Sequence, residues 1–222
     1  MPKKSIFCPY GHTNCSVIAQ LEKVRAQCER LLQQVETDGL TGLYNYRHFM
    51  KTLDAEMERT RRMGLPTSLI MIDLDHFKVV NDRYGHEIGN LVLQHVAALW
   101  QENTRKIDTV CRYGGEEFAI ILPNTMLMRA VNTAERLRKI LEESFIEVDG
   151  QKVRVTASFG VDVFTHSEQM SPRQFIERTD GYLIQAKGLG RNKVCYSGRR
   201  GKKGPTEITK EERADLLFHV KE

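Results

Sequence analysis

The sequence predicts an α+β domain with a split βαβ sheet of the ferredoxin-like or palm type. Three observations carry this prediction: a continuous apolar run at residues 68–73, a two-glycine hairpin pattern within residues 109–122, and helical periodicity in the segments around them. A continuous apolar run is typical of a strand that is buried on both faces. The order of strand, helix, hairpin, helix and strand is that of a split βαβ unit.

The individual elements follow one another along the chain. The apolar run is the expected central strand, and residues 91–99 repeat apolar side chains at helical spacing after it. Gly114 and Gly115 lie between two β-rich arms, which is the usual signal of a hairpin. The remaining expected elements are a helix at 126–143, a strand at 153–161, a helix at 172–187 and a strand at 194–196.

The composition is that of a globular protein. The chain has 222 residues, of which 41% are hydrophobic and 28% are charged, and this length suits one domain with extensions. The formal net charge of +4 is too small to favour nucleic acid as a partner. No apolar run approaches the roughly 20 residues that cross a bilayer, and no signal-sequence core follows the first lysines. We therefore expect a cytoplasmic protein without a membrane anchor.

Four zones are expected: a Cys/His-containing segment at 1–16, a stalk at 17–37, the domain itself at 38–197, and a basic linker with a short C-terminal helix at 198–222. The stalk places hydrophobic residues at alternating spacings of four and three, at Val17, Leu21, Val24, Cys28, Leu31 and Val35. This rhythm is typical of a coiled-coil seam and predicts a dimer. Because fewer than three heptads are present, a helix that lies on its own domain is the alternative.

The N-terminal segment contains a candidate zinc site. Cys8, His12 and Cys15 could supply three ligands to Zn²⁺. Their spacing matches no standard zinc finger, so a segment without metal is the alternative. Five cysteines, an odd number, do not form the disulfide framework of a small secreted protein, and reduced thiols are expected.

Asp73, Glu116 and Glu117 are the candidate reactive groups. Asp73 ends the predicted central strand, and Glu116 follows the two glycines, where missing side chains let a ligand approach the backbone. If these strands are neighbours, the carboxylates converge. Such oxygen ligands suit Mg²⁺, which typically takes one or two carboxylates and leaves its other positions to water and phosphate.

Lys78, Lys187 and Arg191 are available for the far side of such a phosphate. Each of these features is weak alone, because a carboxylate at a strand end is more often a turn residue and basic side chains are usually solvated. Their joint appearance is what indicates a phosphate-binding site.

Ordered motifs across residues 38–196 resemble those of the GGDEF family of diguanylate cyclases. They are Asp-Gly-Leu-Thr-Gly-Leu-Tyr-Asn at 38–45, Asp-Leu-Asp-His-Phe-Lys at 73–78, Asn-Asp-Arg-Tyr-Gly-His at 81–86, Gly-Gly-Glu-Glu-Phe at 114–118, and Ala-Lys-Gly-Leu-Gly-Arg-Asn at 186–192. The fourth motif is the family signature in its GGEEF form. The resemblance implies a palm-like sheet and a reaction that converts two GTP molecules into cyclic di-GMP and two pyrophosphates.

The resemblance also implies roles for the acidic residues. Asp73 and Glu116 would hold two Mg²⁺ ions, with Mn²⁺ able to substitute and with the backbone carbonyl of Leu74 assisting. Glu117 would assist the metal and accept the hydroxyl proton. Since each domain has one nucleotide pocket, the product requires two domains that face each other, and the stalk would hold such a homodimer together.

The nucleotide itself would be held by the remaining motif residues. Lys78, Lys187 and Arg191 would bind the β- and γ-phosphates, and Gly114 and Gly115 would let the backbone approach the nucleotide. These are again implications of the resemblance.

The resemblance assigns guanine recognition to Asn81 and Asn90. The second position is usually an aspartate in the family, which accepts two hydrogens from guanine. Asparagine offers one acceptor and one donor and should discriminate less sharply. GTP remains the expected substrate, and a mixed enzyme that also makes cyclic GMP-AMP is the alternative. Tyr46 also replaces an arginine that is usual in the entry motif of the family.

A second site is implied by Arg105 and Asp108, which resemble the RxxD inhibitory motif of the family, and Arg136 falls where a further arginine often contributes. Cyclic di-GMP would then be both product and inhibitor, and an ordinary surface ion pair is the alternative. A catalytically silent receptor of cyclic di-GMP is a further alternative for the whole domain. The intact carboxylates argue against such a receptor.

Overall fold

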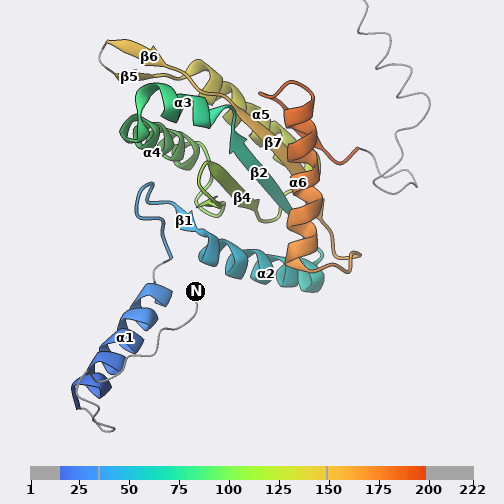
Figure 1. Ribbon diagram of the computed structural model, residues 1–222. Helices are drawn as coiled ribbons and strands as arrows, with labels where there is room; N and C mark the ends of the chain where they lie inside the picture. Colours follow the sequence, from blue (N-terminus) through green and yellow to red (C-terminus); the bar gives the residue numbers. More distant parts are fainter. Residues whose placement is uncertain (1–15, 35, 149, 199–222) are drawn as a thin grey trace, which may run out of the picture.

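The computed structural model describes residues 16–34, 36–148 and 150–198 (Figure 1). Its helices are α1 (Ser16–Gln34), α2 (Tyr46–Met63), α3 (Phe77–Tyr84), α4 (His86–Glu102), α5 (Leu127–Glu143) and α6 (Pro172–Gly188). Its strands are β1 (Tyr44–Asn45), β2 (Thr67–Leu74), β3 (Thr109–Arg112), β4 (Glu117–Leu122), β5 (Ile146–Val148), β6 (Gln151–Val153), β7 (Ala157–Phe164) and β8 (Val194–Tyr196). The predicted zinc ligands Cys8, His12 and Cys15 and the predicted C-terminal helix lie outside the described residues.

The main sheet confirms the predicted α+β class. It has six strands in the order β1-β3-β4-β2-β7-β8. β2 runs antiparallel to both β4 and β7, whereas β1 pairs with β3 and β7 pairs with β8 in parallel, so the sheet is mixed. All eight residues of β2 are buried, which explains why this strand appears in the sequence as an uninterrupted apolar run.

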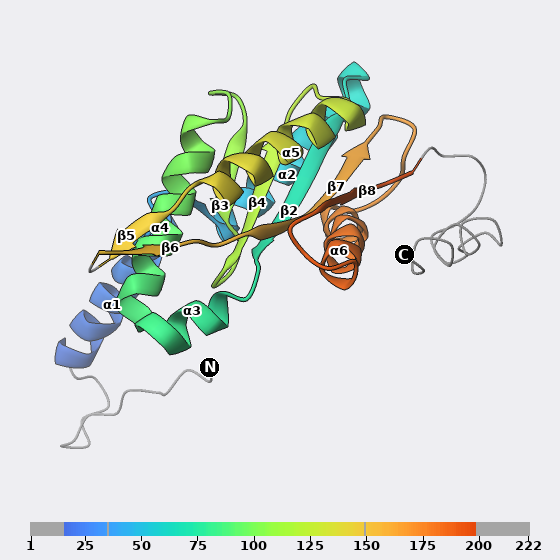
Figure 2. The same cartoon turned by 90° about the horizontal axis from the view of Figure 1, so that it is seen from above.

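Helices cover both faces of this sheet. Side chains alternate along β2, so that Ile70 and Ile72 pack into one hydrophobic cluster with α4 and α5, while Leu69 and Met71 pack into a second cluster with α2 and α6. As a result, α5 and α6 lie on opposite sides of β7 (Figure 2). None of the described helices combines the length and apolarity that a membrane span requires.

Two parts of the fold differ from the sequence prediction. The predicted strand at 153–161 is divided: β6 pairs with β5 in a separate two-stranded sheet, and β7 begins only at Ala157. The helix α2 was not predicted at all. It begins after Asn45, whose side chain accepts a hydrogen bond from the His48 backbone N–H, and ends at Gly64 with a φ of 75°, which are ordinary helix-start and helix-stop signals.

The position of α6 depends on its close contact with β7. A Cβ at Gly160 would overlap the backbone of Leu183 and Thr179, so only glycine lets the helix approach this closely. Arg178 adds polar anchors on the same side, because it forms ion pairs with Asp162 and with Glu168. The helix is therefore fixed to the sheet along its length before it reaches its C-terminal lysine.

Replacing Gly160 by alanine should lower the free energy of unfolding by about 1–3 kcal/mol, because the added methyl group forces α6 away from β7. Urea denaturation checks this. Gly181→Ala is the matched control, since Gly181 lies in α6 with open space at its Cβ position and gains helix propensity instead. Equal midpoints for the two variants would contradict the packing argument.

Candidate functional site

The structure brings the three candidate carboxylates together. In the ladder between β2 and β4, Asp73 lies opposite Glu117, and the Leu74 N–H donates to the Glu116 carbonyl at 3.2 Å. The end of the central strand therefore meets the end of the glycine hairpin. Asp73 is buried, and the two glutamates are partly buried.

The charges in this cluster are unbalanced. Burial raises the pKa of Glu116, and the negative charge of Asp73 raises it further, while Lys187 opposes the shift. Burial and Asp73 likewise raise the pKa of Glu117, with a smaller contribution from Asp180 on α6. The ammonium of Lys187 lies 2.8 Å from Asp73 Oδ2. Several carboxylates thus share one close cation, which is an environment that favours binding of a further cation.

This donor set fits Mg²⁺ better than a metal with a complete protein cage. In the part of the chain that the structure describes, no group of three histidine, cysteine, aspartate or glutamate side chains is arranged to hold a metal. Mg²⁺ needs only one or two carboxylates when substrate phosphates and water complete its shell. Asp73, Glu116 and the backbone at Leu74 lie side by side at the strand end and can provide such a partial shell.

The glycine hairpin is shaped around Glu117. A Cβ at Gly114 would lie 2.5 Å from Glu117 Oε2, so the missing side chain makes room for this carboxylate. The N–H groups of Tyr113 and Gly114 both donate to the Glu117 carbonyl, at 2.8 and 3.1 Å. The turn therefore holds both glutamates at the edge of the acidic cluster.

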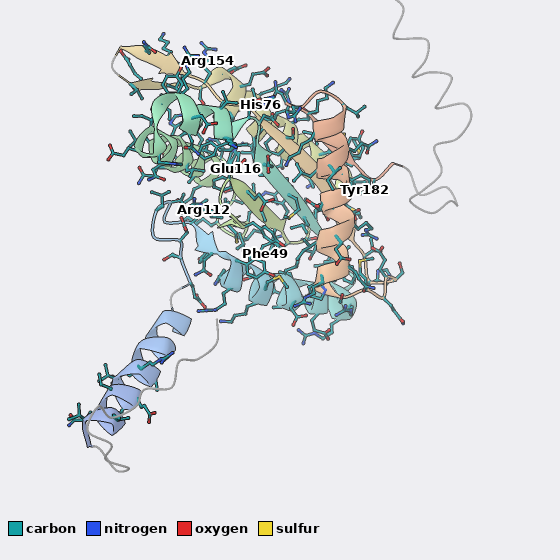
Figure 3. The ribbon with its side chains drawn as sticks, in the orientation of Figure 1. Phe49, His76, Arg112, Glu116, Arg154 and Tyr182 are labelled. Carbon is teal, nitrogen blue, oxygen red and sulfur yellow. The ribbon has the colours of Figure 1, made fainter. Side chains whose placement is uncertain are left out.

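Arg112 fixes the hairpin and was not among the residues singled out from the sequence (Figure 3). Its Nε and Nη2 donate to the Gly115 carbonyl at 3.1 and 2.8 Å. Its Nη1 donates to Asp38 Oδ1 at 3.1 Å, and Asp38 also accepts from the backbone and hydroxyl of Thr41. Burial alone would raise the pKa of Asp38, but the hydrogen bonds from Thr41 and Arg112 outweigh it and lower the pKa.

The predicted phosphate ligands occupy different settings. Lys187 lies in the last turn of α6 and contacts Asp73 directly. Lys78 is exposed in the first turn of α3, and Arg191 is exposed in the loop after α6, with a φ of 63°. The structure therefore joins Lys187 to the carboxylates, while the roles of Lys78 and Arg191 stay predictions.

The two asparagines assigned to base recognition lie on adjoining helices. Asn81 is in α3, and a Cβ at Gly89 of α4 would overlap its Oδ1, so the amide of Asn81 packs directly on the α4 backbone. Asn90 is the next residue along α4 and is exposed. Asn81 thus packs at the junction between α3 and α4, and Asn90 follows Gly89 directly in the chain.

Arg105 and Asp108 form a compact turn at a separate place. The Arg105 N–H donates to Asp108 Oδ2 at 2.9 Å, and the Asp108 N–H donates to the Arg105 carbonyl at 2.9 Å. Burial raises the pKa of Asp108, and the charges of Arg105 and Arg136 oppose this shift. Asp108 Oδ1 is buried without a hydrogen-bond partner among the described residues.

The turn borders a hollow of about 350 Å³ that also touches Thr37 and Tyr44. Both Arg105 and Asp108 line this hollow. The hydrogen bonds between the two residues involve the backbone of both and the carboxylate of Asp108. The inhibitory role of this turn stays a prediction.

Comparison with known proteins identifies the family to which this fold and acidic site belong. Residues 35–193 match the family described as "Diguanylate cyclase, GGDEF domain". The chain belongs to this GGDEF family.

Its relatives agree with this assignment. Diguanylate cyclase A of Treponema denticola is 38% identical over 194 residues, which are 86% of this chain and 52% of the relative. Response regulator PleD of Caulobacter vibrioides is 41% identical over 173 residues, which are 77% of this chain and 38% of the relative. The chain thus spans about half, or less, of the length of these curated relatives.

Solved structures share the fold. The coiled coil and GGDEF domain of DgcB from Caulobacter crescentus, in complex with c-di-GMP, superposes with a TM-score of 0.70 at 29% identity, covering 82% of this chain and 95% of that one. The active GGEEF domain of a diguanylate cyclase from Vibrio cholerae gives a TM-score of 0.65 at 32% identity, covering 70% of this chain and 97% of that one.

Replacing Arg112 by alanine should lower the free energy of unfolding by about 1.5–3 kcal/mol, because Asp38 and the Gly115 carbonyl lose charge-assisted hydrogen bonds. Thermal and urea denaturation check this. Lys51→Ala removes an exposed ion pair with Glu36 and should change stability by less than about 1 kcal/mol. Similar losses in the two variants would contradict a special role for Arg112.

Replacing Arg112 by alanine should also change how the free energy of unfolding depends on pH. Because the native pKa of Asp38 lies below its ordinary value of 3.8, its carboxylate stabilises the fold above that value and loses this contribution as the pH falls through the native pKa. In Arg112→Ala the Asp38 pKa should rise, and the contribution should shrink. Carbon NMR titration of the Asp38 carboxylate measures its pKa, from which the change in the stability contribution follows. An unchanged pKa in Arg112→Ala would contradict the role given to Arg112.

Proposed function

We propose that this chain is a diguanylate cyclase that condenses two GTP molecules into cyclic di-GMP and two pyrophosphates as a homodimer. The main observation in support of this proposal is that Asp73 lies close to Glu116 and Glu117 where β2 meets the glycine hairpin. Membership of the GGDEF family supports the proposal. A relative at 38% identity is named a diguanylate cyclase, and a solved neighbour was crystallised with c-di-GMP.

Asp73, Glu116 and the carbonyl of Leu74 would hold two Mg²⁺ ions. When bound, these ions supply a lowered pKa for the attacking 3′-hydroxyl and neutralise charge on the α-phosphate. Glu117 adjoins this site, since it lies opposite Asp73 in the ladder, and would accept the hydroxyl proton. The 3′-oxygen of one GTP then bonds to the α-phosphorus of the other, and the bond to the pyrophosphate oxygen breaks.

The basic residues of the chain orient the leaving group in this proposal. Lys187 is already held beside the acidic cluster by its contact with Asp73. With Lys78 and Arg191 it would bind the β- and γ-phosphates and keep the pyrophosphate oxygen in line with the attacking oxygen. Asn81, which packs on the α4 backbone at Gly89, and the exposed Asn90 would bind the guanine edge.

Dimerisation through α1 is supported by the exposure of its apolar residues. Val17, Leu21 and Val24 are 60%, 49% and 57% exposed, although they follow the spacing of a coiled-coil seam. A second copy of the helix would bury them. The DgcB structure that resembles this chain also includes a coiled coil.

Product inhibition through Arg105, Asp108 and Arg136 is part of the proposal. The unpartnered Asp108 Oδ1 can accept hydrogens from guanine, and the two arginines can bind phosphate or the guanine O6 and N7 atoms. Zinc binding at the N-terminus has no support from the described residues and is not proposed.

A cyclase with mixed specificity is the second candidate, because Asn90 stands where the family usually has aspartate. Its exposed amide offers one donor and one acceptor, so adenine is rejected less strongly than by a carboxylate. A silent receptor is not favoured, since Asp73, Glu116 and Glu117 are all present and close together.

Replacing Glu116 by glutamine should abolish formation of cyclic di-GMP while leaving the fold intact, because the neutral amide is a poor ligand for Mg²⁺. Purified protein is incubated with Mg²⁺ and GTP, and products are resolved by mass. Glu177→Gln, at an exposed position of α6, is the control and should retain activity. Product formed by the Glu116 variant at the rate of this control would refute the proposed metal role.

Replacing Asn90 by aspartate should raise the preference for GTP over ATP by about tenfold, because a carboxylate accepts two guanine hydrogens and repels the adenine N1 acceptor. The measurement is the ratio of cyclic di-GMP to mixed product when both nucleotides are supplied with Mg²⁺. An unaltered ratio would remove the argument for mixed specificity.

A further inference from the structure

The loop that follows α6 has an uncommon backbone. Arg191 and Asn192 are consecutive residues with positive φ angles of 63° and 46°. Side chains other than glycine rarely adopt this conformation, and two in succession persist only when surrounding contacts impose them. The contacts that hold this loop are therefore informative about its purpose.

A buried carboxylate holds the backbone of the loop. The Asn192 N–H donates to Asp75 Oδ2 at 2.9 Å. Asp75 is only 6% exposed, and it also accepts hydrogen bonds from the hydroxyls of Thr156 at 2.7 Å and Ser158 at 2.6 Å. Within the part of the chain that the structure describes, the Asp75 carboxylate thus accepts three hydrogen bonds. It stands two residues after Asp73 in the chain.

The side chain of Asn192 is held by α5, which lies beside this loop (Figure 1). Its Oδ1 accepts from Arg138 Nη1 at 3.0 Å, and its Nδ2 donates to Glu142 Oε1 at 2.7 Å. Arg138 is itself ion-paired with Glu135 and Glu142. Both the oxygen and the nitrogen of the Asn192 side-chain amide are therefore hydrogen-bonded to charged residues of α5.

We propose that Asn192 is a positioning residue that holds Arg191 toward the triphosphate at a fixed place relative to Asp73. Asp75 ties the loop to the end of the strand that carries the metal-binding carboxylate, and Arg138 with Glu142 ties it to α5. This inference rests on the proposed function for the identity of the nucleotide. Phosphate and metal ligands must keep their separation closely for in-line transfer, and this pair of attachments provides it.

The first test compares two asparagines with the same backbone conformation. Asn124 has a φ of 47° and is exposed, so Asn124→Ala loses the same backbone preference without loss of a clamp. Binding of 3′-deoxy-GTP with Mg²⁺, which lacks the attacking hydroxyl and cannot react, is measured by calorimetry. Asn192→Ala should bind it about tenfold more weakly, whereas Asn124→Ala should bind as the unmodified chain does. Equal affinity of the two variants would overturn the proposal.

The second test asks whether Asn192 acts through Arg191. In an Arg191→Ala background, the further change Asn192→Ala should cause little additional loss of affinity, because the group it positions is absent. A full additional loss would show a general structural role and overturn the proposal. Asn192→Gly keeps the backbone conformation but removes the clamp, and wild-type affinity in this variant would likewise overturn it.

The outcomes also separate this inference from the proposed function. If the unmodified chain does not bind the GTP analogue, both fail. If it binds the analogue and forms cyclic di-GMP while Asn192→Ala is unaffected, only the positioning role fails. Urea denaturation of each variant confirms that the affinities compare folded proteins.

Discussion

The antiparallel pairing of β2 with β4 is the constraint on which the candidate site depends. Its register sets Asp73 opposite Glu117. All of β2 and most of β4 are buried between two helical layers, so a shift by one residue would move each side chain to the other layer and disrupt the packing. The hydrophobic core therefore enforces the distance between carboxylates that would otherwise repel one another. The ammonium of Lys187 reduces this repulsion through its contact with Asp73. Lys187 can reach Asp73 because α6 is packed closely against β7 at Gly160.

Much of this arrangement could be predicted from the sequence, for identifiable reasons. The central strand is indicated by its continuous apolar run and the hairpin by its two adjacent glycines. The family motifs place the carboxylates at the ends of these elements. α2 was not predicted, although Asn45 and Gly64 are ordinary start and stop signals at its ends. The late start of β7 could not be predicted, since the strand begins at Ala157, opposite the last residue of β2, Leu74, and this pairing exists only in the completed fold.

Arg112 and Asn192 were also missed, and their case is different. Neither position has a local pattern that distinguishes it from a solvated polar residue. Their importance arises from partners far away in the chain, Asp38 for Arg112 and Asp75 for Asn192. Such long-range polar contacts depend on the completed fold, so a single sequence indicates them only after a family resemblance or a structure supplies the neighbours.

The contact between Asp38 and Arg112 has a mechanical consequence. Asp38 stands at the start of the domain, just after the stalk segment, and Arg112 grips the carbonyl of the residue directly before Glu116. A displacement of Asp38 would therefore act on the glycine hairpin through Arg112 as well as through the pairing of β1 with β3. The segment that enters the domain is thereby coupled to the loop that carries Glu116.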